Sequence, residues 1–266
     1  MIPAMTPDDL VLVTGAGGFI GGHLVAELLR RGHRRVRAVD IKPLDQWFQR
    51  AEAADSRRLD LRRLEACHEA AAGTAAVFNL AADMGGMGFI ETHKAACMLS
   101  VLINTHLLLA ARDAGTDRFF FASSACVYRA DRQDVTDVEP LREGDAYPAM
   151  PEDGYGWEKL FGERMCRHFR EDFGLKTRVA RYHNVYGRDE LVTINQLVDI
   201  VERIAGVRLR RRYRLEAPTG VRGRNSDNTQ VTQALGWAPT GRLEDGLRKT
   251  YEWIAASMTP TAATTT

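Results

Sequence analysis

Apolar and polar positions along this chain follow two different periods. Short apolar runs bounded by glycine or charged residues are typical of buried strands, whereas apolar residues three and four apart are typical of helices. The predicted strands cover residues 10–14, 36–39, 75–82, 119–122 and 177–181. The predicted helices cover a segment around 24–29 and residues 91–114, 155–173, 191–205 and 241–256. Strands and helices that alternate in this way build an α/β fold around a parallel sheet.

A glycine-rich turn joins the first predicted strand to the first helix. In a dinucleotide site, one glycine permits the tight turn, a second lets the backbone approach the pyrophosphate, and a third lets the helix pack on the strand. The N–H groups of the helix N-terminus then face the phosphates. The predicted cofactor contacts in this turn are Gly15, Gly18, Phe19, Ile20 and Gly21.

Asp40 ends the second predicted strand, about 20 residues after the last glycine of the turn. A carboxylate at this place accepts hydrogen bonds from the adenosine ribose and repels a 2′-phosphate, which favours NAD over NADP. The glycines are spaced G-x-x-G-x-x-G, because Ile20 stands where the usual fingerprint has its last glycine. The alternative is an ordinary glycine-rich turn beside a surface aspartate.

Further cofactor contacts are predicted at the carboxyl ends of other strands, where ligands of parallel sheets lie. Asp60 and Leu61 follow a third strand, where the aspartate either reaches the adenine edge or is a solvated turn residue. Ala81 and Ala82 leave room for a cofactor after the strand at 75–82. The fold class is thus a Rossmann-type doubly wound parallel sheet with a smaller C-terminal α/β lobe for the substrate.

The predicted domain boundaries follow from these elements. Residues 1–187 form the NAD-binding Rossmann domain and residues 188–257 form the shortened, interleaved C-terminal lobe. Residues 258–266 are rich in threonine and alanine and are expected to be a disordered tail.

Bulk properties narrow the class of protein. A net charge of +1 with 45% hydrophobic and 27% charged residues is typical of a globular protein and indicates neither a nucleic-acid nor a membrane partner. The chain has 4 cysteines without metal-ligand spacing, so no metal site is predicted and a reducing, cytoplasmic location is expected. No signal peptide and no membrane-spanning run are apparent. Alternating apolar and basic residues at 207–214 predict a solvated edge strand.

Candidate catalytic residues follow the strand at 119–122. Ser123 and Ser124 end that strand, and Tyr155 and Lys159 are four residues apart, so they share one face of the helix at 155–173. The lysine ammonium beside the phenol is expected to lower the tyrosine pKa. A Y-x-x-x-K pair alone is more often a packed tyrosine with a solvated lysine, but the glycine turn and the serines favour the catalytic interpretation.

Two loops indicate where a substrate binds. The glycines at 85, 86 and 88 favour a loop whose backbone can approach a ligand, with Gly85, Gly86 and Met87 as predicted contacts. The loop at 220–227 carries Arg222 and Arg224, whose planar guanidinium groups suit a diphosphate.

These motifs resemble the extended short-chain dehydrogenase/reductase family. The resemblance rests on T-G-A-G-G-F-I-G, on Asp40, on S-S-x-x-V-Y and on Y-x-x-x-K. Closer still, the segments around 83–88, 124–128, 152–159, 183–187 and 220–227 resemble the GDP-mannose 3,5-epimerase branch of that family.

The resemblance implies a mechanism and a partner. Tyr155, assisted by Lys159 and Ser124, is implied to take a proton from a sugar 4-hydroxyl while NAD oxidises C4. Cys126 matches the family's acid/base cysteine, with a buried inert thiol as the alternative. Asn184 is an implied contact of a nucleotide-sugar substrate, expected to be a GDP-hexose. A homodimer through helices near 94–113 and 155–173 is also implied.

The chain departs from this branch after Gly187. The family has a segment there that carries an opposing acid/base lysine, whereas here Gly187 leads directly through Arg188 to Glu190. Either this is a shortened paralogue with altered chemistry or the sequence omits a segment, and the sheet edge that an excised strand would expose favours omission.

The predicted function is therefore that of an NAD-dependent nucleotide-sugar epimerase that inverts C5, or C3 and C5. The alternatives are a 4-epimerase, dehydratase or reductase acting on another nucleotide sugar, or an inactive NAD-binding regulator. A dehydratase favours an acidic residue beside the serine, where this chain has Ala125 and Cys126.

Overall fold

A computed structural model describes residues 5–183, 190–217 and 219–258 of the chain. Contacts divide it into two units: a sheet unit of Met1–Ala130 and Ala146–Tyr182, and a C-terminal unit of Asp131–Asp145 and His183–Thr266. Residues 131–145 thus group with the C-terminal unit, although the sequence-based boundary lies at 187. The predicted disordered tail falls almost wholly on residues 259–266, outside the described residues.

The sheet unit contains six parallel strands in the order β3-β2-β1-β4-β5-β6, which confirms the predicted Rossmann-type doubly wound sheet. The C-terminal lobe was predicted to be α/β, but the described residues of the C-terminal unit contain no strand. The order reverses between β1 and β4, and dinucleotides bind at such a point, beyond the carboxyl ends of the strands. The strands are β1 (Val11–Thr14), β2 (Val36–Asp40), β3 (Asp55–Arg58), β4 (Ala76–Asn79), β5 (Arg118–Ser124) and β6 (Lys176–Tyr182).

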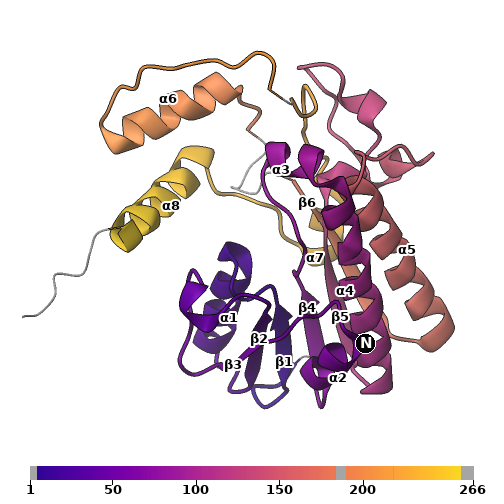
Figure 1. Cartoon of the computed structure of the whole chain (residues 1–266). Coiled ribbons are helices and arrows are strands. Elements are labelled where there is room, and N and C mark those ends of the chain that lie inside the picture. Colours follow the sequence, from indigo (N-terminus) through magenta and orange to yellow (C-terminus); the bar gives the residue numbers. More distant parts are fainter. Residues whose placement is uncertain (1–4, 184–189, 218, 259–266) are drawn as a thin grey trace, which may run out of the picture. The chain divides into compact units, whose positions relative to one another are not determined.

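Helices cover both faces of the sheet (Figure 1). On one face, α1 (Phe19–Arg30) packs with Val25 and Leu28 against Val11 and Val13. On the other face, apolar residues of α2, α4 and α5 pack against Leu12, Phe119 and Phe121. The elements of that face, with the short helix before them, are α2 (Leu64–Ala71), α3 (Met87–Thr92), α4 (Lys94–Asp113) and α5 (Tyr155–Phe173).

The helix predicted at 91–114 is in fact two helices. The helix is interrupted at His93, whose backbone is not helical (φ −127°, ψ 40°), so that α3 ends before this residue and α4 begins after it. The His93 ring stacks on Phe89, with centroids 4.5 Å apart. The predicted glycine loop also ends earlier than expected, because Gly88 lies inside α3.

α4 is, within the described residues, the helix that is long and apolar enough to cross a membrane by length and composition. The sequence-based expectation that no segment meets these criteria is therefore wrong. The core helix of a folded domain meets them too. Leu107, Leu108, Ala110 and Ala111 of α4 are completely buried in the core on the sheet, which accounts for its apolar composition.

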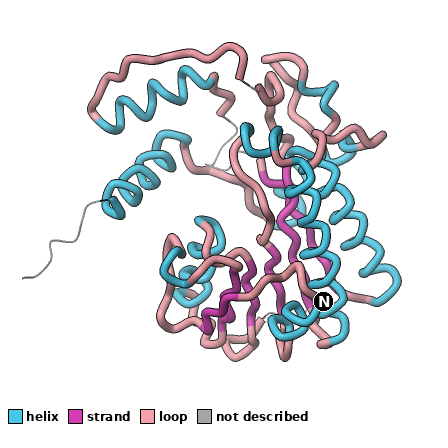
Figure 2. The backbone as a smooth tube through the Cα atoms, viewed as in Figure 1, coloured by secondary structure: helices cyan, strands magenta, loops and turns pink. Residues whose placement is uncertain are grey.

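The C-terminal unit is built from helices and long loops (Figure 2). Its helices are α6 (Ile194–Ala205), α7 (Thr229–Leu235) and α8 (Leu243–Met258). Thr193 caps α6 in a reciprocal capping box with Gln196. An ion pair of 2.9 Å between Arg203 and Glu244 joins α6 to α8.

The edge strand predicted at 207–214 is absent, and the segment is a loop. Side chains of α6 hold it in place of a strand neighbour. Arg211 forms ion pairs with Asp199 and, at 2.8 Å, with Glu202. The Leu209 N–H donates to the Glu202 carboxylate at 3.0 Å. The alternation of apolar and basic residues predicted a strand, but the described part of this unit offers it no strand to pair with.

A buried chain of hydrogen bonds crosses the sheet unit. Thr14 Oγ1 on β1 donates to Asn79 Oδ1 on β4 at 2.9 Å. Asn79 Nδ2 donates to Asn104 Oδ1 on α4 at 3.1 Å, and Asn104 Nδ2 donates to the Gly162 carbonyl on α5 at 3.4 Å. We call these four residues the polar chain; it satisfies polar groups that burial would otherwise penalise.

Replacing Gly162 tests how closely α5 approaches the sheet. A Cβ at Gly162 would lie 2.6 Å from Cζ of Phe121. We expect Gly162→Ala to lower the free energy of unfolding by about 1–3 kcal/mol, because the core has no room for the methyl group. Thermal unfolding measures the change.

Gly88→Ala is the matched control, because Gly88 also lies within a helix but faces open space. We expect this variant to unfold at or above the wild-type temperature. Equal unfolding temperatures for Gly162→Ala and the wild type would contradict the close approach of α5 to β5.

Candidate active site

Two glycines of the turn, Gly15 and Gly21, stand where a side chain has no room. Gly15 has a φ of +69°, and a Cβ on it would lie 2.9 Å from the Leu80 carbonyl. A Cβ on Gly21, in the first turn of α1, would lie 2.2 Å from the carbonyl oxygen of Gly15. Gly18 is the N-cap and supplies no side-chain cap. This geometry is the one in which a backbone turn and a helix N-terminus receive a pyrophosphate.

Asp40 lies beside this turn, at the end of β2. Its Oδ2 accepts a hydrogen bond from the Gly17 N–H at 3.0 Å, and its Oδ1 accepts one from the Lys42 N–H at 3.0 Å. The carboxylate is thereby fixed next to the glycine turn, where the sequence predicts it to face the ribose. The glycine turn and Asp40 together fit the adenosine diphosphate half of NAD.

The segment that follows β2 folds back over the glycine turn. A Cβ on Gly17 would lie 2.8 Å from the Trp47 ring, and one on Gly22 would lie 2.5 Å from Cγ of Gln49. The Phe48 N–H also donates to the Gly17 carbonyl at 3.3 Å. We call residues 41–50 the β2 strap; its Trp47 is buried in the same core cluster as Val11 and Val13.

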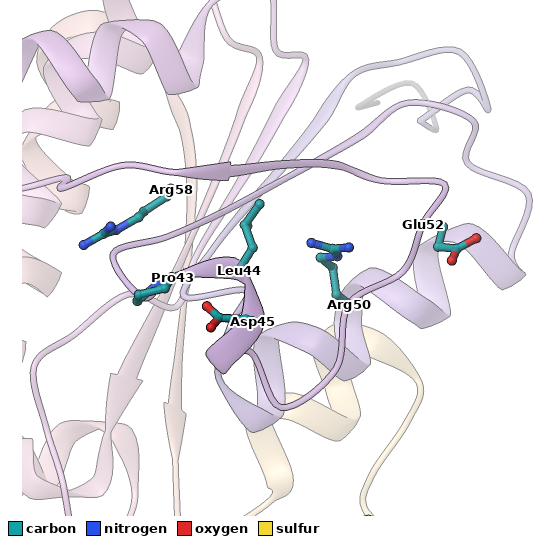
Figure 3. A pocket seen from close by; sticks show the side chains of 6 residues that line it. All are labelled: Pro43, Leu44, Asp45, Arg50, Glu52 and Arg58. Atoms are coloured by element: carbon teal, nitrogen blue, oxygen red, sulfur yellow. The ribbon is translucent and has the colours of Figure 1, made fainter. Parts of the chain in front are cut away.

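A cavity of about 750 Å³ opens between the β2 strap and β3 (Figure 3). Arg58 Nε donates to the Ile41 carbonyl at 3.1 Å and fixes one wall. None of the predicted cofactor residues lines it. The lining residues are Pro43, Leu44, Asp45, Arg50, Glu52 and Arg58.

Asp60 and Leu61 follow closely after β3, which ends at Arg58. Arg62 forms an ion pair of 2.7 Å with Asp60 and holds the pKa of its carboxyl below the usual range through a hydrogen bond. Leu61 is buried in the core on the α2 face. The carboxylate of Asp60 is thus charge-compensated, unlike that of Asp40, which binds backbone N–H groups.

Ala81 and Ala82 follow β4, which ends at Asn79. Ser123 lies near the end of β5. Ala82 packs against the cluster that contains Tyr155, and Ala81 packs against the core. Ser123 donates to Glu163 Oε1 at 2.6 Å, and Glu163 forms a partly buried ion pair of 2.7 Å with Arg181. The Ser123 hydroxyl is therefore bound to Glu163, an acceptor that the sequence did not indicate.

Ser124, Cys126 and Tyr155 come together at the end of β5. The chain turns there into the short helix η2 (Ala125–Val127), and Ser124 Oγ accepts from the Cys126 N–H at 3.2 Å. Cys126 and Tyr155 belong to one buried cluster with Ile90 and Cys97. These residues are far apart in the sequence, and the fold joins them.

Gly156 makes this junction possible. A Cβ on Gly156 would lie 2.4 Å from the carbonyl oxygen of Cys126, so only glycine lets the first turn of α5 lie on η2. The Glu152 N–H donates to the same carbonyl at 3.0 Å. The contact fixes Tyr155 against the turn that carries Cys126. Gly156 is a site residue that the sequence analysis missed, although a glycine in the first turn of a helix was a signal.

The pKa of Tyr155 is not lowered as the sequence predicts. The Lys159 Nζ lies 5.4 Å from the centroid of the Tyr155 ring, but only 3.5 Å from a carboxylate oxygen of Glu158. The pKa of Tyr155 is raised, first because of burial and then because of Cys126 and Glu158. A hydrogen bond with Ser124 acts in the opposite direction. The expected lowering of the tyrosine pKa is therefore wrong, because burial raises it more than the hydrogen bond with Ser124 lowers it.

The predicted substrate residues lie in both units. Gly86 is the N-cap of α3, Gly85 precedes it, and Met87 is the first residue of that helix. A Cβ on Gly85 would lie 2.9 Å from Phe89. Asn184 lies outside the described residues.

Arg222 and Arg224 belong to the C-terminal unit, where a buried glutamine binds both parts of their loop. The Gln133 carbonyl accepts from the Arg222 N–H at 3.0 Å, and Gln133 Oε1 accepts from Arg224 Nε at 2.7 Å. Gln133 is completely buried. A Cβ on Gly223 would lie 2.5 Å from the Val135 carbonyl, so the two loops interlock. The sequence analysis missed Gln133, since nothing local links residue 133 to residue 224.

One parallel sheet carries a glycine turn, an acidic strand end and a serine, and the helix α5 adds a tyrosine and a lysine. This combination defines a short-chain dehydrogenase/reductase. The sequence pattern of the "NAD dependent epimerase/dehydratase family" matches residues 11–206, and the chain belongs to this family. NAD is accordingly its cofactor, and its chemistry is that of an epimerase.

The chain is similar to curated proteins over most of its length. It is 36% identical to "GDP-mannose 3,5-epimerase 1" of Oryza sativa subsp. japonica, over 309 positions that cover 92% of this chain and 81% of the relative. It is 35% identical to "GDP-mannose 3,5-epimerase" of Arabidopsis thaliana, with the same coverage. The 309 aligned positions exceed the 266 residues of this chain, so the relatives contain residues without a counterpart here.

Solved structures share the fold. The UDP-glucose 4-epimerase of Thermotoga maritima superposes with a TM-score of 0.80 at 22% identity and covers 93% of this chain and 99% of its own. The UDP-glucose 4-epimerase of Thermus thermophilus, solved with NAD, gives a TM-score of 0.78 at 20% identity, with the same coverage.

Cofactor preference tests the role of Asp40. We expect the wild type to bind NAD more tightly than NADP, because the carboxylate repels a 2′-phosphate. In Asp40→Asn the amide keeps an acceptor for one backbone N–H and loses the charge. The preference should fall by about tenfold, or ~1.4 kcal/mol. Titration calorimetry with both cofactors measures it.

Asp60→Asn is the matched control, since Arg62 already neutralises that carboxylate. Its ratio of the two affinities should equal that of the wild type. Equal affinity of the wild type for NAD and NADP would contradict the assignment of Asp40.

Proposed function

We propose that this protein is a nucleotide-sugar epimerase that acts on GDP-mannose and inverts C5, or C3 and C5, through a 4-keto intermediate. The observation that carries the proposal is the buried cluster in which Cys126 and Tyr155 meet. Inversion through a ketone needs a group that acts on the hydroxyl and a group that acts on a neighbouring carbon, side by side. The similarity to plant GDP-mannose 3,5-epimerases supports the choice of sugar nucleotide.

Tyr155 is the proposed base for the 4-hydroxyl. Its phenolate takes the hydroxyl proton, and the Ser124 hydroxyl donates a hydrogen bond to the same sugar oxygen. NAD, when bound, supplies the two-electron oxidation of C4 and its later reversal. Because burial raises the pKa of Tyr155, the phenolate needs positive charge nearby, for which the Lys159 ammonium is suited, since it lies 5.4 Å from the ring centroid of Tyr155.

Cys126 is the proposed acid/base at carbon. A ketone at C4 acidifies the C–H bonds at C3 and C5, so that a thiolate can remove one of these protons and a thiol can return it. The Cys126 side chain is only 6% exposed. A buried site protects the enolate from unwanted protonation by water, which supports catalysis rather than inert packing.

The diphosphate of the substrate is proposed to bind Arg222 and Arg224. Guanidinium groups match phosphate oxygens with paired hydrogen bonds. The hydrogen bond from Arg224 Nε to Gln133 holds one edge of that guanidinium and orients the remaining donors. Other nucleotide sugars offer the same diphosphate, and competition between GDP-mannose and UDP-glucose distinguishes them.

We also propose a homodimer that forms through α4 and α5. The two helices carry large apolar side chains that are partly exposed in the single chain, as expected of a covered interface. These side chains are Met98, Leu99, Leu102, Trp157 and Phe161. A reducing, cytoplasmic location is proposed as well, because none of the cysteines Cys67, Cys97, Cys126 and Cys166 of the described residues is in a disulfide.

Two substitutions separate the steps of the proposed reaction. Cys126→Ala should abolish exchange of the C3 or C5 hydrogens with D₂O but retain transient NAD reduction, since Tyr155 and Ser124 remain. Tyr155→Phe should remove both signals, because exchange requires the ketone. Loss of one acid/base group costs about 10²–10⁴ in rate, which stopped-flow absorbance and proton NMR resolve.

Cys97→Ala is the control, because Cys97 is a buried thiol in the same cluster without a proposed catalytic role. It should exchange deuterium at the wild-type rate. Wild-type exchange in Cys126→Ala would show that Cys126 only packs. NAD reduction without any exchange in the wild type would contradict epimerisation.

The dimer is tested by placing a charge on the exposed apolar face. Leu99→Glu should shift the protein from dimer to monomer at micromolar concentration in sedimentation velocity. Leu215→Glu, at an exposed leucine outside the two helices, should leave the dimer intact. A monomeric wild type would overturn the proposal.

A further inference from the structure

A buried carboxylate lies beside the catalytic lysine, and the mechanism above does not use it. Glu158 is in the first turn of α5 and is only 3% exposed. Its Oε2 is buried and has no hydrogen-bond partner. Fully buried glutamates are rare unless they are paired, so this one requires an explanation.

Glu158 forms an ion pair with Lys159. The Lys159 Nζ lies 3.5 Å from Glu158 Oε2, and the side chains of both residues are almost completely inaccessible. The same ammonium lies 4.8 Å from the ring centroid of Phe121 and 5.4 Å from that of Tyr155. One buried cation is therefore shared between a carboxylate and two aromatic rings, one of which belongs to the proposed base.

The titratable groups around this pair come from three elements. Tyr155 and Cys166 lie on α5 itself, Cys97 lies on α4, and Cys126 lies on η2. Burial raises the pKa of Glu158, and Lys159 opposes this effect. A negative charge on Glu158 in turn raises the pKa values of Tyr155 and Cys97. The charge on the Glu158 carboxyl group therefore changes the pKa of the Tyr155 phenol.

We propose that Glu158 is a positioning residue that holds the ammonium of Lys159 and sets the pH range in which Tyr155 acts as a base. When Glu158 is ionised, its charge offsets that of Lys159 and the phenolate is disfavoured. When Glu158 is protonated, the positive field of Lys159 acts on the phenol uncompensated. This inference rests on the proposed role of Tyr155.

Glu158→Gln removes the charge and keeps the shape of the side chain. Removing a negative charge near Tyr155 favours the phenolate, so the acidic limb of the pH profile for NAD reduction should move down by roughly half to one pH unit. Glu158→Asp is the matched control, because it retains the charge and should leave the limb at the wild-type pH. A lower rate at every pH without a shift in Glu158→Gln would show that Glu158 only packs.

A second measurement needs neither substrate nor cofactor. Carbon-13 NMR of protein labelled at the glutamate carboxyl carbons follows each titration, and the signal missing from Glu158→Gln identifies Glu158. Its midpoint should lie above those of exposed glutamates and rise further in Lys159→Met, where the compensating cation is lost. A midpoint in the range of the exposed glutamates, or no response to Lys159→Met, would overturn the proposal.

The two readouts distinguish this inference from the proposed function. A wild type that does not turn over GDP-mannose would contradict the function. The carboxyl titration would still decide whether Glu158 and Lys159 form a coupled pair.

Discussion

The polar chain from Thr14 to Gly162 is the constraint on which the site depends. It links β1, from which the glycine turn starts, to α5, which carries Tyr155, through two buried asparagines. Each buried amide is costly unless its partners are in place, so a shift of either end would leave polar groups unsatisfied. The cofactor half and the catalytic half of the sheet unit are therefore held at one spacing.

Elsewhere in the protein, three glycines allow a backbone carbonyl to come closer than a Cβ atom would permit. Gly21 lies against the Gly15 carbonyl, Gly156 against the Cys126 carbonyl, and Gly223 against the Val135 carbonyl. The first contact shapes the cofactor turn, the second supports Tyr155, and the third closes the loop of Arg222 and Arg224. In each case the missing Cβ lets two segments meet that lie far apart or turn sharply in the chain.

Much of the fold and part of the site could be predicted from the sequence. Strong local patterns were sufficient for the glycine turn, for Asp40 at the end of β2, and for α5, whose bounds match the expectation. Patterns without tertiary information failed elsewhere: alternation at 207–214 predicted a strand that has no neighbour, and the break at His93 has no glycine or proline to mark it. The electrostatics failed most clearly, because the pKa of Tyr155 depends on burial and on Glu158, neither of which the Y-x-x-x-K spacing reveals.

The contact between Gly156 and Cys126 involves only the backbone of residue 126. The close approach of α5 to η2 therefore does not depend on which side chain stands at 126, while position 156 has no room for a side chain. A substitution at 126 can then change the group that faces the substrate carbon while the backbone that supports Tyr155 keeps its contact with α5. The same economy makes residue 126 the natural place at which to redirect the fate of a keto sugar by design.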